Sequence, residues 1–177
     1  MTSFEGRADA VDVLTHGREA DAFEAELAPL LDEAVRLATG MLLNAVEAED
    51  AVQDACVRAW RRRANRREGT DLRPWFLGIV ANQCREALRG PWWQVLRIAE
   101  PEGRRESRTG DSAALIDLRA ALARLPHRRR LVVVLRYYLD LPFEDVAAAA
   151  GCSVDAAKAL ARRATTDLQR ALSGEPR

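Results

Sequence analysis

The sequence is poor in the residues that build sheets. Aromatic residues make up 6% of its 177 residues, and runs of β-branched residues are scarce, which disfavours a β fold. Alanine, leucine, arginine and glutamate dominate instead, and all four favour helix. The hydrophobic content of 48% is enough to bury a core and argues against a disordered chain. We therefore expect an all-α fold, in one ordinary domain or two small ones.

Cysteine and histidine are also too few and too scattered for the chemistry they usually carry. The three cysteines, Cys56, Cys84 and Cys152, lie far apart without a CxxC pair, which argues against a disulfide framework and a zinc site. We expect them to be buried free thiols. His16 and His127 are isolated, and neither an HExxH motif nor a phosphate-binding glycine loop is present. The sequence thus predicts neither an enzyme nor a cofactor.

No signal peptide and no apolar run of membrane length occur, so we expect a cytoplasmic protein without membrane insertion. The net charge is zero, but the charges are unevenly placed. Residues 1–54 carry 3 arginines against 13 acids, and residues 55–108 carry 13 arginines against 6 acids. Such asymmetry indicates one surface for a basic partner and another for a polyanion. Ordinary solvated helix faces are the alternative for any single charge.

Helical periodicity divides the chain into two blocks. Residues 1–18 lack it and form a loose arm, whereas residues 19–90 contain three helices, the first of them kinked or restarted at Pro29. Residues 91–111 are expected to form a flexible linker, because Gly90-Pro91 stops the helix and the stretch "AEPEGRRESRTGDS" is polar and charged. Residues 112–173 contain about four more helices. Within them "LVVVLRYY" could be a buried strand, but Pro126 and the helical neighbourhood favour a helix.

Residues 141–164, "LPFEDVAAAAGCSVDAAKALARRA", have the pattern of two short helices joined by a turn. Gly151 is expected in the turn, because only glycine adopts a left-handed backbone there without steric strain from a Cβ. Ala147 is small enough for the helices to cross closely, and Ser153 can cap the second helix. These features favour a helix-turn-helix, whose second helix enters a DNA major groove, over a plain helical hairpin.

Two further surfaces lie in the first block. The helix expected over residues 45–65 has an exposed face that could dock a partner. This face comprises Asp50, Gln53, Asp54 and Val57. The C-terminal end of the same helix, "RAWRRRANRR", places arginines beside aromatic residues, and unstacked single-stranded bases bind to such a combination. Helix-dipole stabilisation is the plainer account of those arginines.

The order of three stretches resembles the extracytoplasmic-function (ECF) sigma factors of bacterial RNA polymerase. These are "NAVEAEDAVQDACVRAW", "RPWFLGIVANQCREALR" and, after the linker, "LARLPHRRRLVVVLRYYLDLPFEDVAAAAGCSVDAAK". The resemblance covers about residues 20–172. It implies that residues 19–90 are sigma region 2, which binds the clamp helices of core polymerase and melts the −10 promoter element. It implies that residues 112–173 are region 4, which binds the −35 element and the polymerase flap.

The resemblance also implies roles for particular residues. Asp50, Gln53 and Asp54 fall at the clamp contact, and residues 65–73 fall in the loop that captures a flipped −10 base. The residues expected at −10 DNA are Asn65, Arg66, Arg67, Arg73, Trp75, Asn82 and Arg85. The implied partners are core RNA polymerase and promoter DNA, with an anti-sigma factor as a third candidate.

The recognition helix departs from the family pattern, because Ala156, Ala159 and Leu160 stand where threonine, serine and arginine are usual. We therefore expect −35 recognition to depend on DNA shape as well as on base edges. Phosphate contacts position a protein without specifying sequence. The expected base-reading residues are Ser153, Asp155, Lys158 and Arg162, and the expected phosphate contacts are Arg128, Arg129, Arg130 and Arg163.

Two other classes of protein share some of these features. A stand-alone helix-turn-helix regulator would bind duplex DNA without polymerase, and a helical interaction bundle would use its arginines only for solubility. The acidic face and the separate arginine-rich loop favour a sigma factor, since a simple repressor needs no strand-opening loop and usually dimerises on a palindrome.

Overall fold

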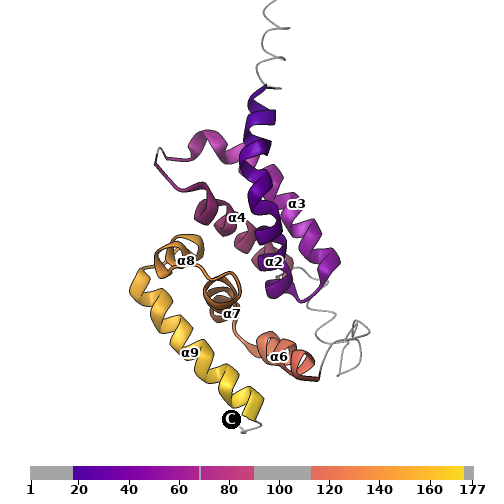
Figure 1. Ribbon diagram of the computed structural model, residues 1–177, viewed down its shortest axis with the longest axis vertical. Helices are drawn as coiled ribbons and strands as arrows, with labels where there is room; N and C mark the ends of the chain where they lie inside the picture. The colour runs from indigo at the N-terminus through magenta and orange to yellow at the C-terminus, as the bar shows by residue number, and fades with distance from the viewer. Residues whose placement is uncertain (1–17, 68, 90–112, 174–177) are drawn as a thin grey trace, which may run out of the picture.

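The computed structural model describes residues 18–67, 69–89 and 113–173, and every regular element in these ranges is helical. The expected all-α fold is confirmed. The predicted arm, apart from residue 18, and the predicted linker lie outside the described residues. Residues 18–27 are helical and are followed by η1 (Ala28–Leu30), α2 (Leu31–Leu42), α3 (Ala45–Arg62), η2 (Arg63–Asn65) and α4 (Leu72–Ala87). The second half contains α6 (Ala113–Arg124), α7 (His127–Val133), η3 (Val134–Tyr138), α8 (Phe143–Ala150) and α9 (Val154–Ser173) (Figure 1).

Polar caps and prolines set the helix boundaries of the first half. Pro29 lies in the first turn of η1, so the kink predicted there is a short 3₁₀ turn between two helices. Asn44 Oδ1 accepts hydrogen bonds from the backbone of Val46 and Glu47 at 3.0 and 3.3 Å, which starts α3. Asp71 caps α4 by accepting from Arg73 N at 3.0 Å.

The "LVVVLRYY" stretch is helical, as its neighbourhood predicted. It forms the end of α7 and then η3, a π-helical turn in which Leu139 N donates to Val134 O at 3.0 Å. Its β-branched residues are buried: Val132 and Val134 are 0% and 2% exposed. The run is apolar because the helix is covered by other helices, and not because it is a strand.

The helix-turn-helix geometry is confirmed in α8 and α9. Gly151 has φ 61°, in the left-handed region, and Cys152 N donates to Ala147 O at 3.0 Å across the end of α8. Ser153 Oγ accepts from Ala156 N at 3.2 Å and so caps α9 as predicted. Val146 and Ala157 are fully buried between the helices.

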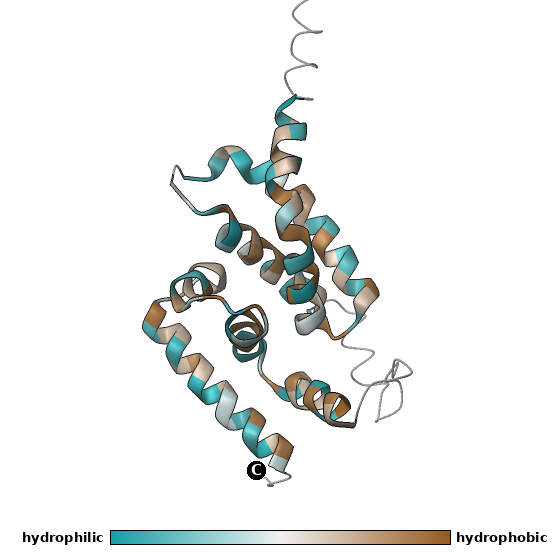
Figure 2. Cartoon of the chain, in the orientation of Figure 1, coloured by the Kyte–Doolittle hydropathy of each residue, from teal (hydrophilic) through white to brown (hydrophobic). Residues whose placement is uncertain are grey.

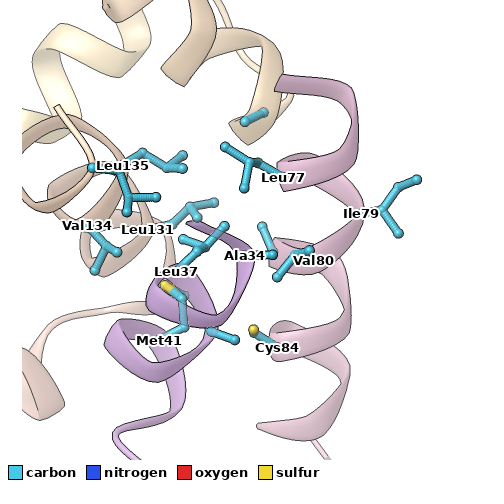
Figure 3. Close-up of a cluster of buried hydrophobic side chains, with 14 of the residues drawn as sticks. Ala34, Leu37, Met41, Leu77, Ile79, Val80, Cys84, Leu131, Val134 and Leu135 are labelled. Carbon is cyan, nitrogen blue, oxygen red and sulfur yellow. The ribbon is translucent and has the colours of Figure 1, made fainter. Parts of the chain in front are cut away.

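The two halves of the chain share one hydrophobic core. Buried side chains of α2 and α4 meet those of α7 and η3 in a single cluster, which includes Leu37, Leu77 and Leu135 (Figure 3). Figure 2 shows apolar residues running beside polar ones along α9, as in an amphipathic helix. A smaller cluster around Leu125 and Ala164 joins α6, α7 and α9. The sequence predicted two helical blocks but not this packing between them.

Only one of the cysteines is buried, which corrects part of the prediction. All three are free thiols, but Cys56 and Cys152 are partly exposed, and only Cys84 lies in the core. Burial raises the pKa of Cys84 to about 12, so its thiol stays protonated. No two of these cysteines form a disulfide in the part of the chain that the structure describes.

Candidate nucleic-acid interface

The predicted docking face of α3 is exposed. Asp50, Gln53 and Asp54 project into solvent, and Val57 is 49% exposed beside them. The pKa of nearby Glu47 is raised by partial burial and then by the negative charge of Asp50. The face thus combines two carboxylates with an apolar residue, which suits a basic partner surface that also offers an apolar contact.

The arginine-rich end of α3 is only partly available to a ligand. Arg63 lies over the ring of Trp60, with Cζ 3.4 Å from the ring centroid, and also pairs with Glu19 at 3.3 Å. Arg66 lies 3.8 Å from Glu26 and is partly buried. Asn65 and Arg67 are the exposed residues among those predicted at this loop.

Arg73 and Trp75, two of the predicted −10 residues, have structural contacts in this arrangement. Arg73 donates from Nε to Glu33 Oε2 at 2.9 Å and from Nη2 to Glu33 Oε1 at 2.6 Å. This bidentate pair joins α4 to α2, and Glu33 is 7% exposed. Trp75 is partly buried and packs against the core. The geometry therefore favours a structural role for Arg73 over a DNA contact.

A polar groove lies between α3 and α4. It is lined by Arg58, Arg62, Ile79, Asn82, Gln83, Arg85 and Glu86. Ile79 and Gln83 form the buried part of this groove, with exposures of 6% and 5%, and Ile79 belongs to the buried cluster drawn in Figure 3. Asn82 and Arg85, both predicted at −10 DNA, are exposed at the groove.

The groove joins Arg58 and Arg62 of the predicted arginine-rich stretch to Gln83, which the sequence did not single out. Arg58 pairs with Glu86 at 2.8 Å across the groove, whereas Arg62 is exposed at the end of α3. Gln83 is 5% exposed, and its Oε1 is buried without a hydrogen-bond partner. An unpaired buried amide oxygen is costly. Gln83 lies four residues after Ile79, so the sequence places the two on one face of a helix. The sequence does not show that α3 packs along this face and forms the groove.

The predicted base-reading residues of α9 form an exposed set. Ser153, Asp155, Lys158 and Arg162 are all exposed, and so is Arg163. Lys158 Nζ lies 5.9 Å from the ring centroid of Phe143 in α8. The first turns of α9 therefore offer a short polar surface that a major groove could accept.

The three consecutive arginines of α7 have different environments. Arg128 is exposed, and Arg129 pairs with Asp167 of α9. Arg130 is 8% exposed and donates to Met41 O at 2.6 Å and to Ala123 O at 2.8 Å. The predicted phosphate contact of Arg130 does not fit this arrangement, because its guanidinium is already buried against carbonyl groups.

Within the described residues no cluster of three potential metal-ligating side chains exists. No helix in those same ranges is long and apolar enough to cross a membrane. The exposed charged and polar side chains described above lie on three surfaces: the acidic face of α3, the α3–α4 groove and the first turns of α9.

Comparison with known proteins places two family models on the chain. The model described as Sigma-70 region 2 matches residues 27–94, and the model described as Sigma-70, region 4 matches residues 115–168. Together they take in all three exposed surfaces.

Individual proteins agree with the family models. The RNA polymerase sigma factor CarQ of Myxococcus xanthus is 32% identical over 163 residues, which cover 88% of this chain and 91% of CarQ. An RNA polymerase sigma-E factor of Streptomyces antibioticus is 27% identical over 147 residues, covering 80% and 79% of the two chains. Among solved structures, the sigma factor RpoE in complex with the anti-sigma factor NepR from Bartonella quintana matches with a TM-score of 0.68 and 26% identity. That match covers 88% of this chain and 99% of RpoE.

Proposed function

The chain belongs to the ECF sigma factors, which bind RNA polymerase and direct promoter-specific initiation, and we propose that its three exposed surfaces divide this work. The acidic face of α3 binds the clamp helices of core polymerase. The α3–α4 groove holds the opened −10 strand, and α9 enters the major groove at −35. The protein acts in the cytoplasm, without catalysis of its own.

The observation that carries the −10 proposal is the α3–α4 groove. Arg62 supplies positive charge for a phosphate backbone, and Arg58 does so on exchanging Glu86 for phosphate, while Asn82 and Gln83 supply amide groups for base edges. A single strand can enter such a groove because its bases are no longer paired. Arg85 extends the basic edge along α4, and Asn65 and Arg67 extend it toward the loop.

Replacing Asn82 with alanine is expected to lower the yield of open complex more than that of closed complex. A base contact of this kind is worth ~1–3 kcal/mol, which corresponds to roughly a fivefold to 150-fold loss. Permanganate footprinting of the −10 region measures the melted bases. Gln169→Ala, which removes an exposed amide from α9, is the matched control. Normal melting by the Asn82 variant would remove this residue from the proposed site.

The −35 proposal rests on the capped and exposed start of α9. Lys158 and Arg162 are exposed and would contact base edges, whereas Arg128, Arg129 and Arg163 would neutralise phosphates once the helix is in the groove. Arg129 would have to exchange Asp167 for phosphate. Ser153 and Asp155 complete the exposed first turn.

Lys158→Ala is expected to reduce the preference for the cognate −35 sequence, by ~1–3 kcal/mol if a bidentate base contact is lost. Arg163→Ala should weaken binding to all duplexes and lower the slope of log K against log salt by about one unit. The measurement is binding of the full chain with core polymerase to cognate and scrambled −35 duplexes over a salt series. An unchanged cognate-to-scrambled ratio for Lys158→Ala would show that this residue does not read bases.

An anti-sigma factor is a third proposed partner. The support is the likeness to RpoE, which was crystallised with the anti-sigma factor NepR. The stand-alone regulator is the alternative function, but it leaves the acidic face of α3 and the α3–α4 groove without a role.

A further inference from the structure

We propose that Gln83 selects one base of the opened −10 strand, by accepting a hydrogen bond from the exocyclic amino group of an adenine or a cytosine at the floor of the α3–α4 groove. This inference rests on the proposed function of the groove and adds the class of base that one position of the strand must carry. Three features support it: an unpaired buried amide, the size and charge of the groove, and an ion pair at its exposed edge.

The amide of Gln83 is buried and has an unused acceptor. Among the described residues that line the groove, Gln83 is the buried polar one, with 5% exposure. Its Oε1 has no hydrogen-bond partner in the part of the chain that the structure describes. Leaving a buried acceptor unpaired costs stability, and folded proteins pair the large majority of such atoms. A ligand that brings a donor to this oxygen would remove that cost when it binds.

The helix places Gln83 where the edge of a base can end. Ile79, Gln83 and Glu86 follow one another at spacings of four and three residues, so they form one stripe of α4 along the groove. Ile79 is 6% exposed and offers an apolar wall for a flat ring. Gln83 lies one turn further along the stripe. A ring that packs on Ile79 would therefore have its polar edge beside the amide.

The groove has the size and charge to hold one base and its phosphate. Its volume of about 200 Å³ is below the roughly 300–1,000 Å³ of sites for drug-sized ligands, so it suits a single planar ring. Three arginines and one glutamate line it, which gives a net charge of +2; these are Arg58, Arg62, Arg85 and Glu86. A single strand supplies both the ring and the negative charge that this surface attracts.

An ion pair spans the groove at its exposed edge. Arg58 and Glu86 join as two forks, Nη2 to Oε2 at 2.8 Å and Nη1 to Oε1 at 3.2 Å. Their side chains are 40% and 49% exposed, so an incoming strand meets the pair before it reaches the buried Gln83. A phosphate that takes Arg58 from Glu86 opens the way to the amide. Selection of the base therefore follows capture of the backbone.

The unpaired oxygen determines the class of base. An amide oxygen only accepts, so the base must donate to it. Adenine and cytosine each carry an amino group that projects from the ring, beside a ring nitrogen that can accept from Gln83 Nε2. Thymine has no amino group and would turn a carbonyl oxygen toward Oε1. Guanine has a ring N–H beside its amino group, which would oppose the Nε2 donor. Adenine and cytosine are therefore favoured over thymine and guanine.

The test replaces Gln83 with methionine, which keeps an unbranched side chain but removes the amide. Core polymerase carrying the full chain is bound to DNA with a short single-stranded segment of random sequence at −10 and a randomised duplex upstream, and the bound DNA is sequenced. We expect the wild type to enrich adenine or cytosine at one position by about fivefold or more. Gln83→Met should lose this enrichment at that position alone. Gln169→Met, at an exposed glutamine of α9, is the matched control.

Base analogues assign the effect to the amino group. Purine in place of an enriched adenine, or pyrimidinone in place of an enriched cytosine, lacks only this group. The substitution should weaken binding by about fivefold or more in the wild type and leave binding by Gln83→Met unchanged. The urea midpoint of Gln83→Met should equal or exceed that of the wild type, because an unpaired buried acceptor has been removed. A purely structural role of Gln83 would instead lower the midpoint and weaken binding to all sequences equally.

The same base preferences in the wild type and in Gln83→Met would overturn the inference, and so would a preference for thymine or guanine that depends on Gln83. If Gln83→Met does not fold, Gln83→Glu takes its place. Its carboxylate still accepts from an amino group, so sensitivity to the analogues should persist, and its loss would contradict the inference.

Failure of the groove itself has a different result. If Asn82→Ala and Arg62→Ala both leave melting of the −10 region unchanged, the groove does not hold the strand and its proposed function is wrong. If those variants reduce melting while Gln83→Met keeps every base preference, only the selection by Gln83 is wrong.

Discussion

Arg73→Met is expected to lower the free energy of unfolding by about 2–3 kcal/mol, the largest effect on stability expected from any ion pair among the described residues. The substitution keeps most of the aliphatic stem but leaves the carboxylate of Glu33, which is 7% exposed, without its bidentate partner. Removing one partner of a fully buried pair typically costs 3–5 kcal/mol, whereas exposed pairs contribute at most about 1. The Arg73 side chain is 38% exposed, which sets the value between these limits.

The measurement is urea unfolding monitored by circular dichroism. Arg58→Met is the matched control, because its ion pair with Glu86 has side chains 40% and 49% exposed and should contribute under about 1 kcal/mol. The double variant Glu33→Leu/Arg73→Leu should recover much of the loss, since it leaves no buried charge. Equal effects of Arg73→Met and Arg58→Met would contradict a structural role for Arg73.

Reversing charge on the acidic face of α3 is expected to have the largest effect on function. Asp50→Lys/Asp54→Lys should weaken core polymerase binding by about tenfold to a hundredfold, equivalent to ~1.4–2.8 kcal/mol. Both side chains are exposed on one face beside Val57, so repulsion from a basic clamp surface would replace attraction. Helicity should be unchanged, because neither side chain is buried.

Affinity for core polymerase, measured at two ionic strengths, tests this interface. Each aspartate is replaced singly and in combination, and Glu24→Lys provides the same charge change at an exposed position of another helix, residues 18–27. The single aspartate variants should lose more affinity than Glu24→Lys, and the difference should shrink at high salt. Equal losses for all single variants would indicate only a long-range effect of net charge.

Local signals in the sequence predicted the helices and their ends well. Gly151 has the left-handed backbone that its place in the turn requires, and Ser153 caps α9. Cap and turn chemistry depends on residues a few positions apart, so one sequence contains the whole signal. The same holds for Pro29, whose effect on the helix is local.

Contacts between distant residues could not be predicted in the same way. Arg73 and Arg130 look like other arginines in a basic stretch, but their partners Glu33 and Met41 are 40 and 89 residues away. Which arginine is buried depends on which helices pack together. Helical periodicity in the sequence predicts a helix but does not show which other helix packs against it. The groove residue Gln83 was missed for the same reason.

The central claim is that this chain gives core RNA polymerase its promoter specificity. The most direct measurement is transcription of fragmented genomic DNA from the source organism by core polymerase, with and without the chain, followed by sequencing of the RNA 5′ ends. We predict discrete new 5′ ends that appear only with the chain and share two sequence motifs, near −10 and −35. Unchanged 5′ ends, together with binding of the chain alone to duplex DNA, would contradict the claim and identify a stand-alone regulator.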